Sequence, residues 1–410
     1  MKNAQKPTKQ LNAAKEVSYP IVSPANLYII LVAGIIYSIA MQMAVLLVPL
    51  YAITLQMPPL SLAFLISLPV ILQLGIRVIG GIINNYFGEK RILMASFLAI
   101  ALAGIVFMSS ETLVYLYVAQ ILLSISRGLF WSTAQTYLSK LPEVKGRLNK
   151  VFGLFEGATA FGAILGLVMA GYLTQWFGFS MAFTCLVIIG TVSFCLCFIL
   201  PDLTRSKSRE TISAGFKNIG RVARHKPLYL AGICAFTAAL PLSLVGSFYP
   251  VYLDSLGIQE GIIGVITSLK AVGTIFAGLV IARFLDRISL TISYTVSMVL
   301  VGVTLIITQM FEAAEILAVI IIFTGLGSGI SSILFQSLTS KYSTEENRGS
   351  AMAFTTNFWT MSHLVTPILF GAITENLGLS YSFIIAGVAI LLFGLMGTVA
   401  FRRFIPENYS

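Results

Sequence analysis

The sequence predicts an all-α membrane protein of twelve transmembrane helices, arranged as two pseudo-symmetric six-helix bundles. The first observation is composition, because 57% of the residues are hydrophobic and 10% are charged, with a mean hydropathy of +0.91. The second is a succession of apolar runs of spanning length, since about 20 helical residues cross a hydrocarbon core about 30 Å thick. The third is that the basic residues fall on alternate connections. Together they exclude an ordinary soluble domain.

The predicted helices follow one another with short connections. A helix satisfies its backbone polar groups within one segment, so it can cross lipid alone. The spans are expected at residues 27–55, 60–84, 90–109, 112–139, 151–176, 180–200, 227–254, 259–282, 290–310, 313–339, 351–375 and 379–401. Residues 1–26 are polar and basic without an apolar core, which predicts a cytoplasmic tail and not a signal peptide.

The positions of lysine and arginine predict the orientation in the membrane. Of the 26 basic residues, 23 lie in the tails or on the connections that follow even-numbered helices, and none lies on the opposite connections. Basic residues near helix ends stay on the cytoplasmic side, so both termini are expected to be cytoplasmic, in an inner or plasma membrane. This arrangement explains the net charge of +10 without nucleic acid and favours contact with anionic lipid.

The chain matches itself at an offset of 201 residues. The clearest matches pair Val48-Pro49-Leu50-Tyr51 with Tyr249-Pro250-Val251-Tyr252, Gln135 with Gln336, Lys140 with Lys341, and Arg147 with Arg348. A constant offset through helices and loops indicates a parallel duplication. It predicts bundles at 27–200 and 227–403, a cytoplasmic central loop at 201–226 and a cytoplasmic tail at 404–410.

Three motifs lie within this repeat. The connection after helix 2 carries Gly81-Ile-Ile-Asn-Asn85-Tyr-Phe-Gly88-Glu-Lys90-Arg91, and helix 4 carries Leu123-x-x-x-Arg127. Helix 5 carries Gly157, Gly166 and Gly171. On these residues the chain resembles the major facilitator superfamily over about residues 25–404. The resemblance implies alternating access around a central site, with these glycines and the loop motif controlling the conformational change.

The motifs also depart from the family pattern. Asn85 stands where the loop motif usually has aspartate, whereas its repeat mate Asp286, followed by Arg287, keeps the acid. The helix-5 glycines resemble an antiporter signature, but Leu167 replaces its common proline. The small-xxx-small pairs Gly153/Gly157 and Gly162/Gly166 are expected to let neighbouring helices approach closely and slide.

Five ionisable residues lie inside predicted helices: Arg77, Arg127, Glu156, Lys270 and His363. Each charge costs roughly 2.5–3.5 kcal/mol at the bilayer centre on insertion scales, so such groups face a cavity or a partner. Arg127 lies roughly 20 Å from the cytoplasmic end of helix 4, beside Trp131 one turn away. For every one of the five, the alternative is a paired charge that only fixes helix contacts, such as an ion pair of Glu156 with Arg77 or Lys150.

The residue types suggest two sets of roles. Glu156, Arg127 and His363 are candidates for proton coupling, because a moving cation can load or release a carboxyl proton. Lys270 shares a stripe with Thr267, Thr274 and Ala277, which predicts a wetted helix face. The candidate substrate-binding residues are Lys270, Arg77, Gln42, Tyr37, Trp131, Gln336 and Asn357.

The first functional prediction is a secondary active transporter that exports a small organic solute in exchange for protons. The alternative is transport of an anion, such as an organic acid, phosphate ester or siderophore, because interior cations outnumber interior acids. A third alternative is a membrane receptor or sensor that transports no solute. We expect no enzyme activity, cofactor or metal, because no cluster of His, Asp or Cys has catalytic or ligand spacing. Since one chain contains both bundles, a functional monomer is expected.

Overall fold

The computed structural model describes residues 25–109, 112–141, 148–202, 226–281, 288–343 and 348–404, and these residues are helical apart from short turns. Ten of the described helices are long and apolar enough to cross a membrane. The elements before residue 203 are α1 (Ala25–Thr54), α2 (Pro59–Phe87), α3 (Glu89–Met108), α4 (Leu113–Lys140), α5 (Leu148–Leu196) and the 3₁₀ turn η2 (Cys197–Ile199). Those that follow are α7 (Lys226–Val245), α8 (Phe248–Ser255), α9 (Glu260–Phe276), the π turn η3 (Ala277–Ile281), α11 (Leu290–Thr308), α12 (Ala314–Lys341), α13 (Arg348–Leu377) and α14 (Leu379–Phe404).

The longest element, α5, covers two predicted helices. It has 49 residues and is interrupted at Gly178, whose φ of 79° is left-handed. Glycine adopts this conformation without the steric cost that a Cβ would add. Because a single crossing needs about 20 residues, α5 is two helices that meet at Gly178, as the predictions at 151–176 and 180–200 required.

Helix 7 was predicted as one span, 227–254, and the structure has one candidate membrane span there, Lys226–Ser255, but the helix is broken within it. The structure has α7 and α8, separated by Gly246 and Ser247. Pro250 cannot continue the backbone hydrogen bonds, and its ring crowds the carbonyl of residue 246. The repeat mate Pro49 lies inside the uninterrupted α1, with Val45 in place of Gly246. Proline alone therefore does not break the helix, and the glycine is what distinguishes the broken copy.

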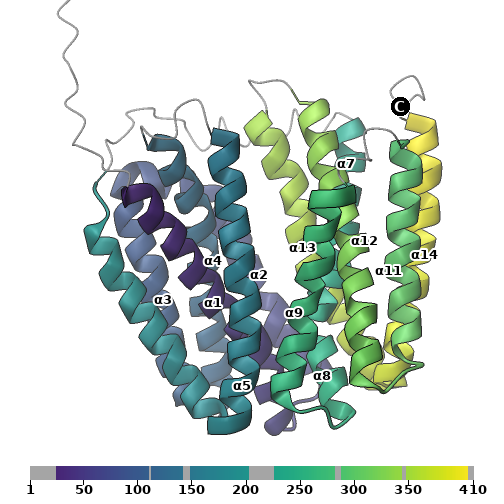
Figure 1. The fold of residues 1–410 in the computed structure, drawn as a ribbon, viewed down its shortest axis with the longest axis horizontal. Coiled ribbons are helices and arrows are strands. Elements are labelled where there is room, and N and C mark those ends of the chain that lie inside the picture. Colours follow the sequence, from purple (N-terminus) through teal and green to yellow (C-terminus); the bar gives the residue numbers. More distant parts are fainter. Residues whose placement is uncertain are drawn as a thin grey trace, which may run out of the picture.

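The two parts of the chain pack by the same plan. We call residues 25–202 the N-terminal group and residues 226–404 the C-terminal group (Figure 1). In the first, α1 packs on α5, α3 on α4 and α2 on α4; in the second, α7 packs on α13, α11 on α12 and α9 on α12. Equivalent elements also begin 201 residues apart, from α1 and α7 through α4 and α12. The offset becomes 200 at the left-handed turns Gly178 and Gly378. The repeat offset is therefore one residue shorter there than the constant 201 that was predicted.

The groups touch through α5 with α9, α2 with α13 and α1 with α8. We call the face where α3 begins and α14 ends the basic face, and the face that carries Gly178 and Gly378 the opposite face. Near the opposite face a Cβ at Gly171 of α5 would collide with the Glu260 carbonyl of α9. At Gly371 of α13 it would lie 2.8 Å from the Pro59 carbonyl of α2.

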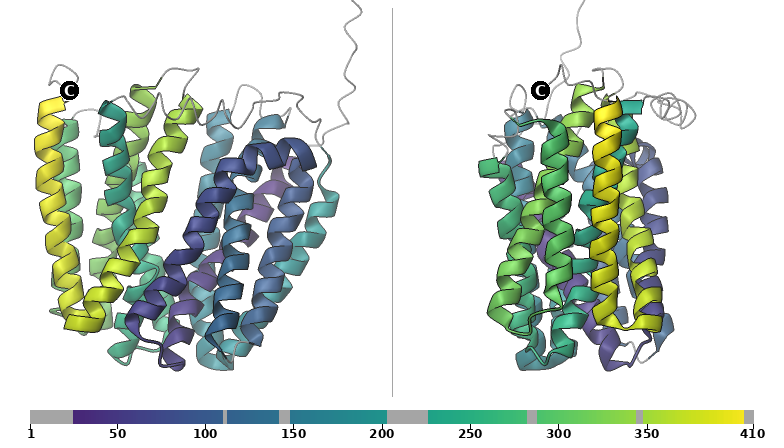
Figure 2. Two further views of the ribbon diagram at one scale, coloured as in Figure 1. Left: turned by 180° about the vertical axis from the view of Figure 1, so that it is seen from behind. Right: turned by 90° about the vertical axis from the view of Figure 1, so that its right-hand side faces the viewer.

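The same helices diverge toward the basic face. No described atom lies within 4 Å of a Cβ placed at Gly75 of α2, at Gly157 of α5 or at Gly278 of η3. Figures 1 and 2 show the N-terminal group leaning toward the C-terminal group at the opposite face. The two groups are therefore in close contact at the opposite face and separated toward the basic face.

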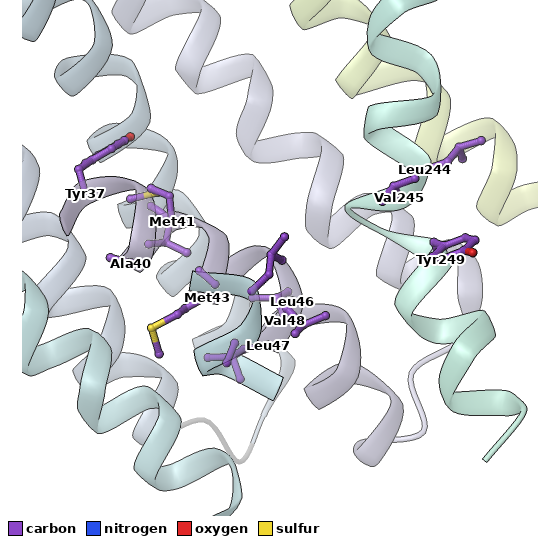
Figure 3. Packing of buried hydrophobic residues seen from close by; sticks show 14 of the residues in the cluster. Tyr37, Ala40, Met41, Met43, Leu46, Leu47, Val48, Leu244, Val245 and Tyr249 are labelled. Carbon is purple, nitrogen blue, oxygen red and sulfur yellow. The ribbon is translucent and has the colours of Figure 1, made fainter. Parts of the chain in front are cut away.

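The apolar core continues between the groups where α1 meets the broken helix. Tyr37 and Met41 of α1 lie on one side, and Leu244, Val245 and Tyr249 of α7 and α8 on the other (Figure 3). A Cβ at Gly246 would be 3.3 Å from the Val45 Cγ1 atom. Because Val45 and Gly246 are repeat mates, this contact lies on the approximate two-fold axis that relates the groups.

Candidate functional site

An aromatic cluster in the N-terminal group surrounds Tyr37. Its ring stacks on Phe130 of α4 with centroids 3.5 Å apart and meets Trp131 edge-on at 6.3 Å. Phe155 of α5 packs against Trp131 at 6.0 Å. Such stacked and edge-on contacts stabilise a packed aromatic cluster beyond simple burial, and Tyr37, Phe130 and Phe155 are all buried in it. Tyr37 and Trp131 were predicted site residues, whereas Phe130 and Phe155 were missed because an apolar ring in a membrane helix carries no signal of its direction.

Arg127 lies one helical turn before Trp131 on α4. Its side chain is half-buried and is close enough to Tyr37 to interact with it electrostatically. Gly128, the next residue, packs against Ile76 of α2, where a Cβ would be 2.7 Å from the Ile76 Cγ2 atom. The structure therefore brings together three residues of the predicted site, namely Arg127, Trp131 and Tyr37.

Lys270 lies on α9. The stripe that it shares with Thr267, Thr274 and Ala277 was predicted to face water, and the structure corrects this prediction. Thr267 is 2% exposed and Ala277 is fully buried, with Ala277 packed against Gly329 of α12. The Thr274 hydroxyl donates to the Gly325 carbonyl of α12 at 3.1 Å. These small residues let α9 and α12 approach closely, so the stripe is a packing surface. The Lys270 side chain itself stays half-buried.

His363 lies on α13 beside an aromatic pair. Its ring stacks on Trp359 at 5.9 Å, and Trp359 contacts Phe335 of α12 at 5.8 Å. The His363 Nδ1 atom lies 3.1 Å from the Trp359 carbonyl oxygen, which can only accept, so this nitrogen carries a proton. The histidine is thus held in one orientation on its own helix.

The remaining polar candidates differ in exposure. Glu156, Gln336 and Asn357 are exposed, and Gln42 is half-buried. At membrane depth an ionisable side chain such as Glu156 is expected to face a cavity or a partner rather than lipid. Glu156 makes no ion pair with any residue in the described ranges. The side chains of its two suggested partners, Arg77 and Lys150, lie outside the described part of the chain. The substrate-binding role predicted for Arg77 therefore stays a prediction.

Two interior cations have no acidic partner in the described structure. Neither Arg127 nor Lys270 has a described carboxylate within the 4.0 Å limit of an ion pair. By contrast, Lys140 at the end of α4 pairs with the buried Glu89 at 2.5 Å. An unpaired cation inside a membrane protein is costly. Among the described side chains, Arg127 on α4 and Lys270 on α9 therefore place an interior positive charge in each group that a ligand could neutralise.

The structure describes the surroundings of only some residues of the predicted conformational motifs. Gly88 has a left-handed φ of 86° between α2 and α3, the Lys90 amine donates to the Phe198 carbonyl at 2.9 Å, and Arg91 is exposed. The surroundings of Gly81 and Asn85, and all of Asp286 and Arg287, lie outside the part of the chain that the structure describes.

The two glycine pairs of α5 have different surroundings. A Cβ at Gly162 or Gly166 would collide with the Ile35 or Ile39 carbonyl of α1. No described atom lies within 4 Å of a Cβ at Gly153 or Gly157. Close packing was predicted for both pairs, and in this structure it is found only for Gly162 and Gly166. Close approach at Gly153 and Gly157 is not found among the described residues of this structure and stays a prediction.

Comparison with known proteins places these features in a wider context. The chain matches the model of the Major Facilitator Superfamily over residues 30–240 and 231–409. It is 23% identical over 380 residues to a probable nitrate transporter, NarT, of Staphylococcus haemolyticus, covering 89% of this chain and 92% of that protein. It is 20% identical to an uncharacterized MFS-type transporter of Methanocaldococcus jannaschii, covering 79% and 84% of the two chains.

Solved structures share the fold. A bacterial homologue of the human lysosomal transporter Spinster, inward-facing and unoccupied, superposes with a TM-score of 0.78 at 10% identity, covering 94% of this chain and 98% of that one. A mutant of the nucleoside transporter NupG gives 0.77 at 14% identity, covering 92% and 99%.

Proposed function

This chain belongs to the Major Facilitator Superfamily, and we propose that within it the protein moves a small anion across the membrane by alternating access. Membership makes it a multi-pass membrane transporter of a small molecule and not an enzyme. The observation that carries the anion proposal is the pair of interior cations, Arg127 and Lys270, without a described carboxylate within 4.0 Å.

Electrostatics favours an anion over a cation at such a site. Two like charges 4 Å apart repel by about 4 kcal/mol at an effective dielectric constant of 20. A cationic solute would face that repulsion, whereas an anion would offset the cost of holding Arg127 or Lys270 in the membrane. This supports the anionic alternative over broad export of cationic compounds.

The surroundings of Arg127 suit a small oxyanion. A guanidinium offers several N–H donors in one plane and matches carboxylate-like geometry with two parallel hydrogen bonds. Tyr37 is close enough to Arg127 to interact with it electrostatically, and Trp131, which Tyr37 meets edge-on, is one turn away on α4. The similarity to probable nitrate transporters supports a small planar anion as the first substrate to test.

The architecture that we propose is the full predicted one, with twelve crossings in two six-helix halves. Its support is the interruption of α5 at Gly178, the membrane length of α13 and the matching packing of the two groups. We further propose that the basic face is cytoplasmic and that one chain suffices for transport. Proton-coupled efflux stays a prediction, for which the exposed Glu156 of α5 is the candidate carrier.

The test is solute counterflow in proteoliposomes containing the purified full-length protein. Labelled nitrate, a labelled monocarboxylate and a labelled lipophilic cation are compared, each with and without a pH gradient. We expect an anion to exchange and the cation not to. Arg127→Gln and Lys270→Gln should each reduce anion exchange by at least about tenfold, because a hydrogen bond to a charged group contributes about 1.5–3 kcal/mol.

The matched control is Arg402→Gln, which removes an exposed arginine at the end of α14. It should exchange anions at the unmodified rate. Exchange of the cation alone, or full anion exchange by both site variants, would contradict the proposal. A pH gradient that drives exchange in the unmodified protein but not in Glu156→Gln would support the predicted proton coupling.

A further inference from the structure

Two hydrogen bonds of the same construction join the two groups at the opposite face. The Gln175 Oε1 atom near the turn of α5 accepts from the Gly261 backbone N–H of α9 at 3.1 Å. The Glu375 Oε2 atom near the end of α13 accepts from the Leu60 backbone N–H of α2 at 3.1 Å. Leu60 and Gly261 are 201 residues apart, and Gln175 and Glu375 are 200 apart, so the approximate two-fold axis relates the two bonds.

Each bond completes a helix that does not cap itself. The first N–H groups of a helix have no intrahelical acceptor, and a side chain of the preceding residue normally supplies one. Gln259 precedes α9 but makes no capping bond from its side chain, and Pro58, which precedes α2, has no polar side chain. In both helices the acceptor comes from the other group. The Gln175 amide also donates to the Gln259 side chain at 3.0 Å.

Close packing beside these bonds ties them to the present arrangement of the groups. Gly171 and Gly371 each lie one helical turn before Gln175 and Glu375, and they bring α5 and α13 against the backbones of Glu260 and Pro59. A hydrogen bond fails when its atoms separate by much more than 3.5 Å. Separation of the groups at the opposite face would therefore break both bonds, whereas separation at the basic face leaves them intact.

The two bonds differ in charge. Glu375 carries a carboxylate, and a charge-assisted hydrogen bond at the positive N-terminal end of a helix is stronger than a neutral one. Gln175 supplies a neutral amide in the equivalent place. Glu375 is exposed and Gln175 is half-buried, so water weakens the charged bond more, but we still expect Glu375 to have the larger effect.

We propose that Gln175 and Glu375 are positioning residues that hold the groups together at the opposite face and so set the balance between the two access states. The proposal rests on alternating access as proposed above. It assigns no contact with the transported solute to either residue. Its prediction is a conformational shift, which is measurable without knowing the substrate.

The experiment measures a distance between spin labels at the opposite face of the full-length protein. Labels at Leu113 of α4 and at Met310 after α11, both exposed, are placed in a background without the four native cysteines. Glu375→Ala should raise the population with the longer distance about fivefold and Gln175→Ala about threefold, because a hydrogen bond contributes roughly 0.5–1.5 kcal/mol. Glu375→Gln retains an acceptor and should restore most of the original distribution.

The neighbouring variant Asn376→Ala is the matched control, because Asn376 is exposed and, among the described residues, its side chain bonds only to the Ala372 carbonyl of α13. If Glu375→Ala is not monodisperse, Glu375→Leu removes the acceptor while keeping bulk. Unchanged distances in both acceptor-free variants would overturn the proposal, and so would a shift in Asn376→Ala or Glu375→Gln as large as in Glu375→Ala. Because no solute is added, failure of the anion assay leaves this result interpretable.

Discussion

Where α5 packs on α1 the N-terminal group uses glycine, and at the equivalent positions of α13 the C-terminal group uses serine and threonine. Gly162 and Gly166 sit directly against α1 carbonyls, whereas Ser362 and Thr366 are buried with their hydroxyl groups 3.2 Å apart. Both groups nevertheless pair their helices in the same order. The pairing therefore does not depend on any one side-chain contact, and each group reaches it with its own residues.

At two other pairs of equivalent positions the groups also differ in residue type while their helices pair in the same order. Glu89 at the start of α3 is buried and paired with Lys140, and its repeat mate at the start of α11 is Leu290, which has no charge. Val45 in the unbroken α1 corresponds to Gly246 at the break between α7 and α8. Exchanging residues between the groups at these positions tests which contacts are required and which are local alternatives.

The largest effect is expected from exchanging the residues at the α5 and α13 positions. Gly166→Thr would drive a Cβ into the Ile39 carbonyl and should destabilise the protein by about 3 kcal/mol, as overpacking does when backbone must move. Thr366→Gly should cost only about 1 kcal/mol, mainly from glycine in a helix. Thermal unfolding in detergent compares the two, with Gly157→Thr as the control at an open position. Equal losses in Gly166→Thr and Gly157→Thr would contradict the packing argument.

A smaller effect is expected at the ion pair of the N-terminal group. Lys140→Met leaves the Glu89 carboxylate, which is 2% exposed, without its cation and should cost about 2 kcal/mol. The double variant Glu89→Leu/Lys140→Met copies the apolar residue of the C-terminal group and should recover most of that loss, because a buried ion pair can be replaced by apolar side chains. Thermal unfolding checks both. The double variant being less stable than the single one would show that the charge itself is needed.

The smallest effect is expected where the repeat mates Val45 and Gly246 meet on the approximate two-fold axis between the groups. Gly246→Ala places a Cβ 3.3 Å from Val45 Cγ1 and should cost about 1 kcal/mol through crowding. Val45→Ala in the same chain should relieve it, giving a coupling of about 0.5 kcal/mol or more. A double-mutant cycle by thermal unfolding measures this term. Strict additivity would mean that the two residues do not touch in solution.

The helix boundaries could be predicted closely, because run length and apolarity decide them locally. The span expected at 90–109 is Glu89–Met108, and the one expected at 290–310 is Leu290–Thr308. The break in helix 7 was missed because Pro49 and Pro250 look alike in sequence, and the difference lies four residues earlier. The grouping of Arg127 with Trp131 on α4 followed from their spacing, but the ring contact of Trp131 with Tyr37 needed the packing of α1 on α4 and α5.

The amino-acid sequence by itself determined which segments leave water, how long they are, and that one half of the chain repeats the other. Each of these follows from the free energy of moving a single segment into lipid and from residue identity along the chain. Only the tertiary structure decided that the Lys270 stripe packs on α12, that Gly157 is open while Gly166 is not, and that Gln175 and Glu375 reach the other group. Lipid and protein interior are both apolar, so hydropathy cannot say which side of a membrane helix meets a neighbour.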